Sequence, residues 1–178
     1  MRRLDFAWAV LAAACLMTAG ACKREDHSVK PEQQAGPASV LAMGDPRSAV
    51  QLTRGFYDPE QASWRWTSKE FSAVLRSPAG SVDKGARLIF KFALPETSIR
   101  QLQSITLSAK VRGTALYPET YTKSGNFTYQ RDIPASVFTA ATGDAVAIDF
   151  ALDKALPPAG SDLRQLGVVA QSVGLEAK

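Results

Sequence analysis

The amino-acid sequence predicts an all-β domain, an antiparallel two-sheet β-sandwich of jelly-roll-like architecture, that follows a signal peptide and a disordered tether. From about residue 50 onward, short runs of alternating apolar and polar residues are separated by Gly, Pro, Asp and Asn, which is typical of strands joined by turns. Seven or eight such runs, each with one apolar face, fit two sheets packed face to face. The runs do not alternate with helical segments, which argues against a parallel α/β fold.

The first 21 residues have the three parts of a secretory signal peptide. Arg2 and Arg3 give a positive start, residues 6–17 (FAWAVLAAACLM) are apolar, and residues 18–21 are small. An apolar run of 12 residues is too short to span a bilayer comfortably. We therefore expect residues 1–21 to be removed from the mature protein.

Residues 19–22 (AGAC) resemble the bacterial lipobox, in which small residues precede an obligatory cysteine. The resemblance implies a diacylglyceryl thioether on Cys22 and usually an acyl chain, such as palmitate, on its amine. Lipoboxes usually have Leu three positions before the cysteine, and Ala19 departs from this pattern. Cys15 is a second candidate, but cleavage there would truncate the apolar run. An ordinary signal cut after Ala21 and an uncleaved N-terminal anchor remain alternatives.

Lipidation of Cys22 would anchor the chain to a membrane. Stable anchoring requires more than one acyl chain, and the lipobox resemblance implies that this condition is met. Lys23 follows the cysteine, and a non-acidic residue there resembles the default sorting signal for the outer membrane in bacteria that have one. We expect a membrane-anchored protein on the periplasmic side or the cell surface, with the outer membrane favoured.

Residues 22–47 are expected to form a flexible tether between the lipid anchor and the folded domain, which is placed at residues 48–178. The tether mixes charges of both signs with Gln, Pro, Gly, Ala and Ser, and shows neither helical nor strand periodicity. The apolar patch at residues 40–43 (VLAM) is the exception. It either packs on the domain or is incidental, and we favour the second interpretation.

Within the domain, each run places its apolar residues on one face. In residues 87–94, for example, Leu88, Phe90 and Phe92 share a face. A single helical turn is expected at 134–140, and residues 162–165 are expected to form a turn. The expected strands cover residues 64–67, 70–76, 87–94, 104–112, 125–133, 145–152 and 166–175.

The composition excludes several kinds of chemistry. Both cysteines lie within the first 22 residues and the only histidine is His27, so the folded part has neither thiol nor imidazole. Disulfides, thiol catalysis, triads with histidine and zinc or thiolate sites are therefore excluded there. The net charge of +4 is not gathered into a basic cluster, so no nucleic-acid partner is expected. No EF-hand-like spacing appears, and we predict no metal and no cofactor.

Paired carboxylates could still make a glycosidase. No spacing among the acidic residues singles out a pair, so enzymatic activity is the least favoured interpretation. The carboxylates considered are Glu60, Glu70, Glu119 and Asp132.

Two passages are specific enough to suggest a family. Residues 55–60 (GFYDPE) with 64–67 (WRWT), and residues 162–168 (DLRQLGV), together resemble a widespread bacterial β-sandwich module found in envelope proteins and beside glycan-building enzymes. The resemblance spans residues 55–175 and implies the fold and the compartment, but no activity. Many carbohydrate-binding modules share the jelly-roll-like shape, which is an analogy of fold alone.

Trp64 and Trp66 lie two residues apart on an expected strand and so point to the same side. Paired indoles could stack on sugar rings, with Tyr57, Tyr117 and Tyr121 assisting. Alternatively both indoles fill the core, and the residues that alternate beyond them favour that interpretation. The candidate ligand-binding residues are Trp64, Trp66, Tyr57 and Arg65.

The specific passages also carry opposite charges. If the first and last strands are neighbours, Glu60 could pair bidentately with Arg164. Asp162 is placed to cap the turn that presents Arg164. We favour a structural staple made by Glu60, Asp162 and Arg164, and the alternative is a cluster that binds the hydroxyls or the anion of a ligand.

These observations predict a lipid-anchored, non-enzymatic envelope protein that recognises a glycan or another envelope component. The alternative is an assembly or structural lipoprotein that docks on a protein complex. A glycan-binding protein should expose aromatic side chains in a groove or on a concave sheet. A docking module should expose a broad apolar patch or an unpaired edge strand.

Overall fold

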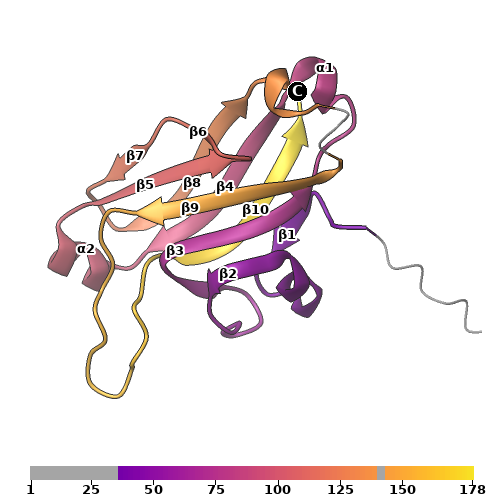
Figure 1. Cartoon of the computed structure of the whole chain (residues 1–178). Coiled ribbons are helices and arrows are strands. Elements are labelled where there is room, and N and C mark those ends of the chain that lie inside the picture. Colours follow the sequence, from indigo (N-terminus) through magenta and orange to yellow (C-terminus); the bar gives the residue numbers. More distant parts are fainter. Residues whose placement is uncertain (1–35, 140–142) are drawn as a thin grey trace, which may run out of the picture. The chain divides into compact units, whose positions relative to one another are not determined.

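The computed structural model describes residues 36–139 and 143–178 (Figure 1). The expected signal peptide, the lipidation site Cys22 and the first part of the tether lie outside these residues. Within the described residues, no helix is long and apolar enough to cross a membrane.

Strands dominate the described chain. The strands are β1 (Val40–Ala42), β2 (Leu52–Phe56), β3 (Arg65–Arg76), β4 (Ala86–Leu94), β5 (Ile105–Val111), β6 (Thr114–Ala115), β7 (Glu119–Tyr121), β8 (Gly125–Ile133), β9 (Ala145–Leu152) and β10 (Val169–Ala177). The helices are short, and they are η1 (Pro46–Gln51), α1 (Ser81–Lys84), α2 (Glu96–Leu102) and η2 (Ala135–Val137). The expected helical turn at 134–140 corresponds to η2, whereas α2 was not expected.

All strand pairs are antiparallel, and they join into one curled sheet (Figure 1). The main path of the sheet is β6-β5-β9-β3-β10-β4-β8, with β1 added to β10, β2 to β3 and β7 to β5. The long strand β3 connects the two halves, because its first residues pair with β10 and residues 70–76 pair with β9. The prediction of an all-β antiparallel fold is confirmed.

Aromatic side chains from both halves of the curled sheet meet in the core. The ring of Phe71 on β3 lies 4.9 Å from that of Phe150 on β9 and 5.5 Å from that of Phe90 on β4. All three rings are shielded from solvent, and Leu88 and Phe92 of β4 are buried beside them. Aromatic pairs at these separations add to the stabilisation from burial alone. Each half therefore has one face in the core and an outer face toward solvent.

The apolar patch at residues 40–43 belongs to the fold. Strand β1 pairs with β10, with Leu41 opposite Val173, and the Met43 amide donates to the Gln171 carbonyl at 2.9 Å. Leu41 and Met43 are buried, whereas Val40 is 56% exposed. This is the two-residue alternation of a strand. The interpretation of the patch as incidental is wrong, because a three-residue strand shows its pattern only once its partner is known.

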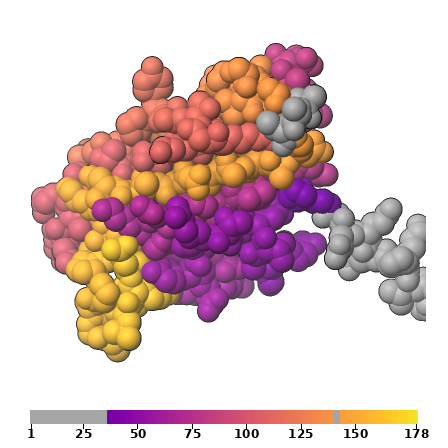
Figure 2. Space-filling model, in the orientation of Figure 1, coloured from indigo at the N-terminus to yellow at the C-terminus, as the bar shows by residue number. Residues whose placement is uncertain are grey.

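A long loop, residues 153–168, connects β9 to β10 and projects from the sheet (Figure 1; Figure 2, lower left). Two isolated antiparallel bridges hold its arms together, Leu156 with Leu166 and Ala159 with Asp162. The arm that returns to the sheet carries the passage at residues 162–168. The loop therefore places this passage beside the start of β3.

Candidate functional site

The two indoles are held at the entrance to β3 by a tight loop. The Glu60 amide donates to the Trp64 carbonyl at 2.8 Å, and the Tyr57 amide donates to the Trp66 carbonyl at 3.0 Å. Between Glu60 and Trp64 the chain reverses through Gln61 and Ala62, whose φ angles are 51° and 49°. These main-chain bonds fix the position of the backbone from which both indoles extend.

Trp64 and Trp66 lie on the outer side of the sheet. Between and beyond them, Arg65 and Thr67 are only 5% and 0% exposed, so the alternation directs those two side chains inward. Both indoles are half-buried and neither belongs to the hydrophobic core. The ring centroids are 6.3 Å apart and the ring planes are nearly perpendicular, at 84°.

The interpretation that the indoles fill the core is therefore wrong. Strand β3 runs without interruption from Arg65 to Arg76, so the face that buries Phe71 continues back to Thr67 and Arg65. The sequence pattern had suggested two separate runs, at 64–67 and 70–76, whose phases need not agree. In one continuous strand the phases must agree, and the tryptophans fall on the opposite face.

Small and polar residues extend this outer face across the next strands. Trp66 is opposite Val169, Val169 is opposite Ala93, and Ala93 is opposite Asn126, so the four residues share one face. The Gln171 side-chain amide donates to Oδ1 of Asn126 at 3.0 Å, and both amides are exposed. Sequence analysis did not single out Asn126 and Gln171, because polar residues on an outer face are common and only the pairing shows that these two meet.

Arg164 gathers the charged residues of the two specific passages. Its Nε and Nη2 atoms donate to the two carboxylate oxygens of Asp162 at 3.0 and 2.9 Å. Its Nη1 atom donates to Oε1 of Glu60 at 3.0 Å. The structure thus brings Glu60 and Arg164 together, but the bidentate partner of Arg164 is Asp162, not Glu60. Asp162 also accepts from the Arg164 main-chain amide at 3.0 Å, closing the turn locally.

This network shifts the pKa values of Asp162 and Arg164. The hydrogen bonds from the Arg164 side chain, followed by the bond from its main-chain amide, lower the pKa of Asp162 to about 2. The same contacts with Asp162 and then Glu60 raise the pKa of Arg164. Asp162 lies next to the turn at the end of the projecting loop, so the network ties Glu60 to that loop. A carboxylate with a lowered pKa is unsuited to serve as a general acid.

Tyr57 is engaged by the same network. The guanidinium carbon of Arg164 lies 5.3 Å from the centre of the Tyr57 ring. The Tyr57 hydroxyl donates to the Gln165 carbonyl at 2.9 Å. The ring and the hydroxyl therefore already have partners within the protein, and Tyr57 supports the loop beside the indoles.

Arg65 is placed inside the protein. Its Nε atom donates to the Met43 carbonyl at 2.9 Å and its Nη1 atom to the Tyr57 carbonyl at 3.0 Å. Because the residue is only 5% exposed, its side chain is not available to a ligand on the outer face. The expectation that Arg65 binds a ligand is corrected, and the residue instead connects the segment after β1 to the loop that carries the indoles.

The other two tyrosines do not join the indoles. Tyr121, expected to be exposed, is 6% exposed and packs against Phe92 and Phe127 at centroid distances of 5.2 and 4.8 Å. Tyr117 is 85% exposed and lies between β6 and β7, and its carbonyl accepts from the side chains of Tyr129 and Arg131 on β8. Tyr117 therefore offers a matched control for experiments on the exposed aromatic side chains.

Two glycines of the specific passages permit close contacts of the backbone. A Cβ on Gly167 would lie 2.6 Å from the Ser68 carbonyl oxygen and 2.7 Å from Cδ1 of Leu152. The Gly167 amide donates to the Thr67 carbonyl at 2.7 Å. Gly55 has φ of 71°, and its Cβ would lie 2.0 Å from the Glu70 carbonyl oxygen. Glycine at these positions lets the returning loop and β2 approach β3 closely.

Each carboxylate considered for a glycosidase is paired with a cation. Lys178 and then Arg87 lower the pKa of Asp132. Within residues 36–139 and 143–178, no group of three or more His, Cys, Asp or Glu residues is placed to hold a metal ion. The nearest pairs are Glu60 with Arg164, Glu70 with Arg54, Glu119 with Arg131, and Asp132 with Arg87 and Lys178.

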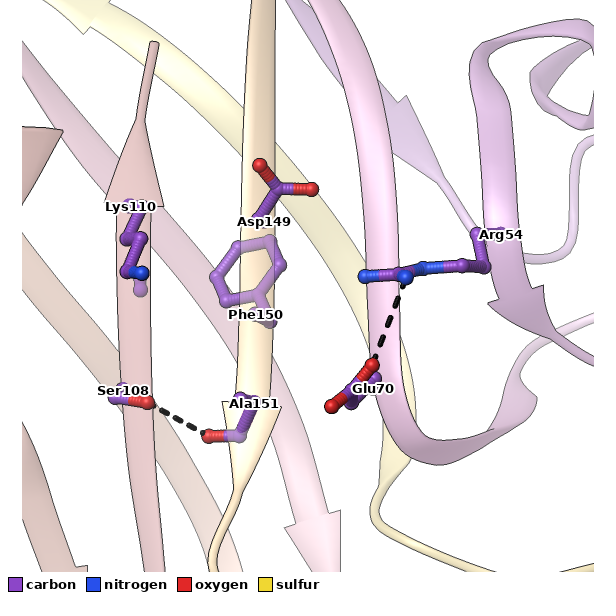
Figure 3. A pocket seen from close by; sticks show the side chains of 8 residues that line it. Arg54, Glu70, Ser108, Lys110, Asp149, Phe150 and Ala151 are labelled. Carbon is purple, nitrogen blue, oxygen red and sulfur yellow. Dashed lines mark hydrogen bonds and ion pairs between the residues drawn. The ribbon is translucent and has the colours of Figure 1, made fainter. Parts of the chain in front are cut away.

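A hollow, the charged groove, lies over β2, β3, β9 and β5 (Figure 3). Arg54 faces Glu70 across it at 3.5 Å, and the Ser108 hydroxyl donates to the Ala151 carbonyl at 3.1 Å. These groups bond to one another within the protein. Its lining residues are Arg54, Glu70, Ser108, Ala109, Lys110, Asp149, Phe150 and Ala151.

Comparison with known proteins leaves the geometry as the guide to function. No protein-family model matches the sequence. No curated protein matches it either. The outer face around Trp64 and Trp66 is therefore the candidate site on structural grounds.

Proposed function

We propose that this protein is a lipid-anchored, non-enzymatic component of the bacterial envelope whose domain recognises a glycan at Trp64 and Trp66. The single observation that carries the proposal is the position of the two half-buried indoles, on the outer face of the sheet and fixed by main-chain bonds. In this proposal Cys22 holds the lipid, the outer membrane is the favoured location, and the domain is a sandwich module of the jelly-roll kind.

The chemistry of the face suits a sugar. Indole rings supply large, rigid apolar surfaces for the ring faces of a pyranose. The amides of Asn126 and Gln171 lie on the same face, but Asn126 is three strands from Trp66, so we do not expect it to contact a sugar stacked on the indoles.

Docking on a protein complex is the alternative, and one observation favours it. Among the described strands, the nine-residue strand β8 pairs only with β4, which leaves one long edge open. That edge is partly protected, because the Arg131 side chain donates to the Gln130 carbonyl at 2.7 Å. The large exposed apolar residues lie on separate elements and form no common patch, and they are Val40, Val50, Val82, Tyr117 and Leu163.

Tryptophan fluorescence of the membrane-extracted protein tests the proposal. Once the expected signal is removed, Trp64 and Trp66 are the only tryptophans, so the emission reports on the site alone. We expect acrylamide to quench the emission and soluble oligosaccharides from the cell envelope to shift it. The control Tyr117→Ala should respond as the wild type does. Emission unaltered by every envelope glycan fraction would rule out glycan recognition at the indoles and favour docking through β8.

A further inference from the structure

We infer that the indole pair accommodates a single pyranose ring, at the end or a branch of a chain, and not the flat face of an extended polysaccharide. This inference rests on the proposed function, because it names the kind of glycan that the same site would take. It follows from the angle between the indoles and from the surroundings of the other aromatic residues.

The angle between the rings decides how many sugars can stack. At 84° and 6.3 Å, the edge of one indole meets the face of the other, so the pair forms a corner with two unlike walls. A pyranose stacked on one wall has the second wall at its side. In an extended chain the next sugar would run into that second wall, whereas a terminal sugar has no neighbour on that side.

No further aromatic surface near the corner extends the stacking site. Arg164 lies over one face of the Tyr57 ring, and the Tyr57 hydroxyl is bonded to the Gln165 carbonyl. Tyr121 is buried in the core, and Tyr117 lies between β6 and β7. Binding of a flat, extended chain needs several coplanar rings in series, and the described residues place only this perpendicular pair on the outer face.

The rest of the outer face lies beyond the reach of a single sugar. Val169, opposite Trp66, is only 9% exposed, and Asn126 is three strands from Trp66, about 14 Å away for strands about 4.8 Å apart. A ring in the corner therefore contacts the indoles and not the amide of Asn126, to which the Gln171 side chain is bonded. The charges of Asp162, Glu60 and Arg164 are already paired with one another.

The experiment compares sugars of different length. An envelope hydrolysate is separated into monosaccharide, disaccharide and tetrasaccharide fractions, and each is titrated against the membrane-extracted protein by tryptophan fluorescence. Saturation-transfer NMR then shows which rings of the tetrasaccharides contact the protein. We expect similar affinity for all fractions and transfer to one ring only, because only one sugar stacks on the indoles. If further rings also stacked, each would raise the affinity about tenfold.

Variants separate a binding defect from a folding defect. Trp64→Ala and Trp66→Ala should each abolish transfer, Trp66→Phe should retain part of it, and Tyr117→Ala should retain all of it. Circular dichroism shows whether each variant is folded. If both alanine variants are unfolded, Trp64→Phe and Trp66→Phe take their place, and we expect each to weaken binding without altering the circular dichroism spectrum.

Two results would overturn the inference, and they can be told apart. Affinity that rises about tenfold with each added sugar, with transfer to several rings, would refute the single-ring site but leave glycan recognition standing. Absence of binding to every fraction would refute both. Binding that survives in the folded Trp64→Ala and Trp66→Ala variants would place the glycan elsewhere on the protein and overturn the inference as well.

Discussion

The outer surface of the sheet has two regions that differ in whether their side chains already have bonding partners within the protein. The charged groove over β2, β3, β9 and β5 contains Arg54, Glu70 and Asp149, and these three side chains bond within the protein (Figure 3). The indole corner contains Trp64 and Trp66, whose half-buried rings contact each other. The groove is hollowed, yet the corner has the unused apolar surface that a ligand could cover.

The difference shows that a hollow by itself is a poor guide to function. In the groove, a ligand would have to displace bonds such as that of the Ser72 hydroxyl to Oδ1 of Asp149 at 2.6 Å. At the corner, the charged side chains next to the indoles pair with one another and stabilise the loop. The indole rings are not needed for those contacts. A preorganised binding site requires a rigid scaffold beneath a surface whose groups are not already bonded within the protein.

The largest effect is expected when the support of the corner is disturbed by Gly167→Ala. The added methyl would lie 2.6 Å from both the Ser68 carbonyl oxygen and Oγ1 of Thr67, so β3 or the loop must move. We expect the free energy of unfolding in urea to fall by about 1–3 kcal/mol. Because Thr67 adjoins Trp66, the tryptophan emission of the folded variant should shift as well.

Gly36→Ala is the matched control, since nothing lies within 4 Å of a Cβ at that position. We expect it to change the free energy of unfolding by less than about 0.5 kcal/mol. A Gly167→Ala protein as stable as the wild type would show that the loop is not clamped to β3. The indole corner would then not differ from the charged groove in being held in place by the loop.

A smaller, pH-dependent effect is expected from Asp162. The Arg164 side chain holds the pKa of Asp162 at about 2 in the folded protein, below that of an aspartate in the unfolded chain. A lowered pKa stabilises the folded state at pH values above the unfolded pKa. This contribution is lost as the pH falls from about 4 to about 2.

Urea unfolding of wild type and Asp162→Asn, measured from pH 5 to pH 2, tests this expectation. The variant should be the less stable protein at pH 5, and the difference should shrink toward pH 2. Arg164→Lys, which keeps the charge but loses the two-pronged contact, should fall between them. A difference that stays constant across the range would show that Asp162 does not act through its ionised form.

Local alternation predicted the long strands well, because each buries one face of the sheet. Strands β8 and β9 have the expected bounds, and β4 begins one residue earlier than expected. Strand β1 is too short for a pattern and depends on a partner near the other end of the chain. Strand β2 was missed because Gly55 interrupts it with φ of 71° and its pairing with β3 is irregular.

The candidate site was predicted only in part, for related reasons. The charged residues in the two specific passages do meet, but the sequence could not show which carboxylate takes the two-pronged contact with Arg164. The side occupied by the indoles depends on whether β3 is one strand or two. Asn126 and Gln171 share the outer face with Trp66 because of the β3-β10-β4-β8 strand order, which local sequence patterns do not contain.

The smallest effect is expected in the charged groove, from Arg54→Ala and Glu70→Ala. The pair is 3.5 Å apart, and its side chains are 57% and 63% exposed, so solvent screens most of the attraction. We expect each variant to change the free energy of unfolding by less than about 0.5 kcal/mol and to leave the fluorescence response to envelope glycans unaltered. Loss of that response in a folded variant would reverse the comparison, because the groove would then contact the ligand. An unaltered response, beside its loss in Trp66→Ala, would place recognition at the corner, where apolar surface and not charge does the binding.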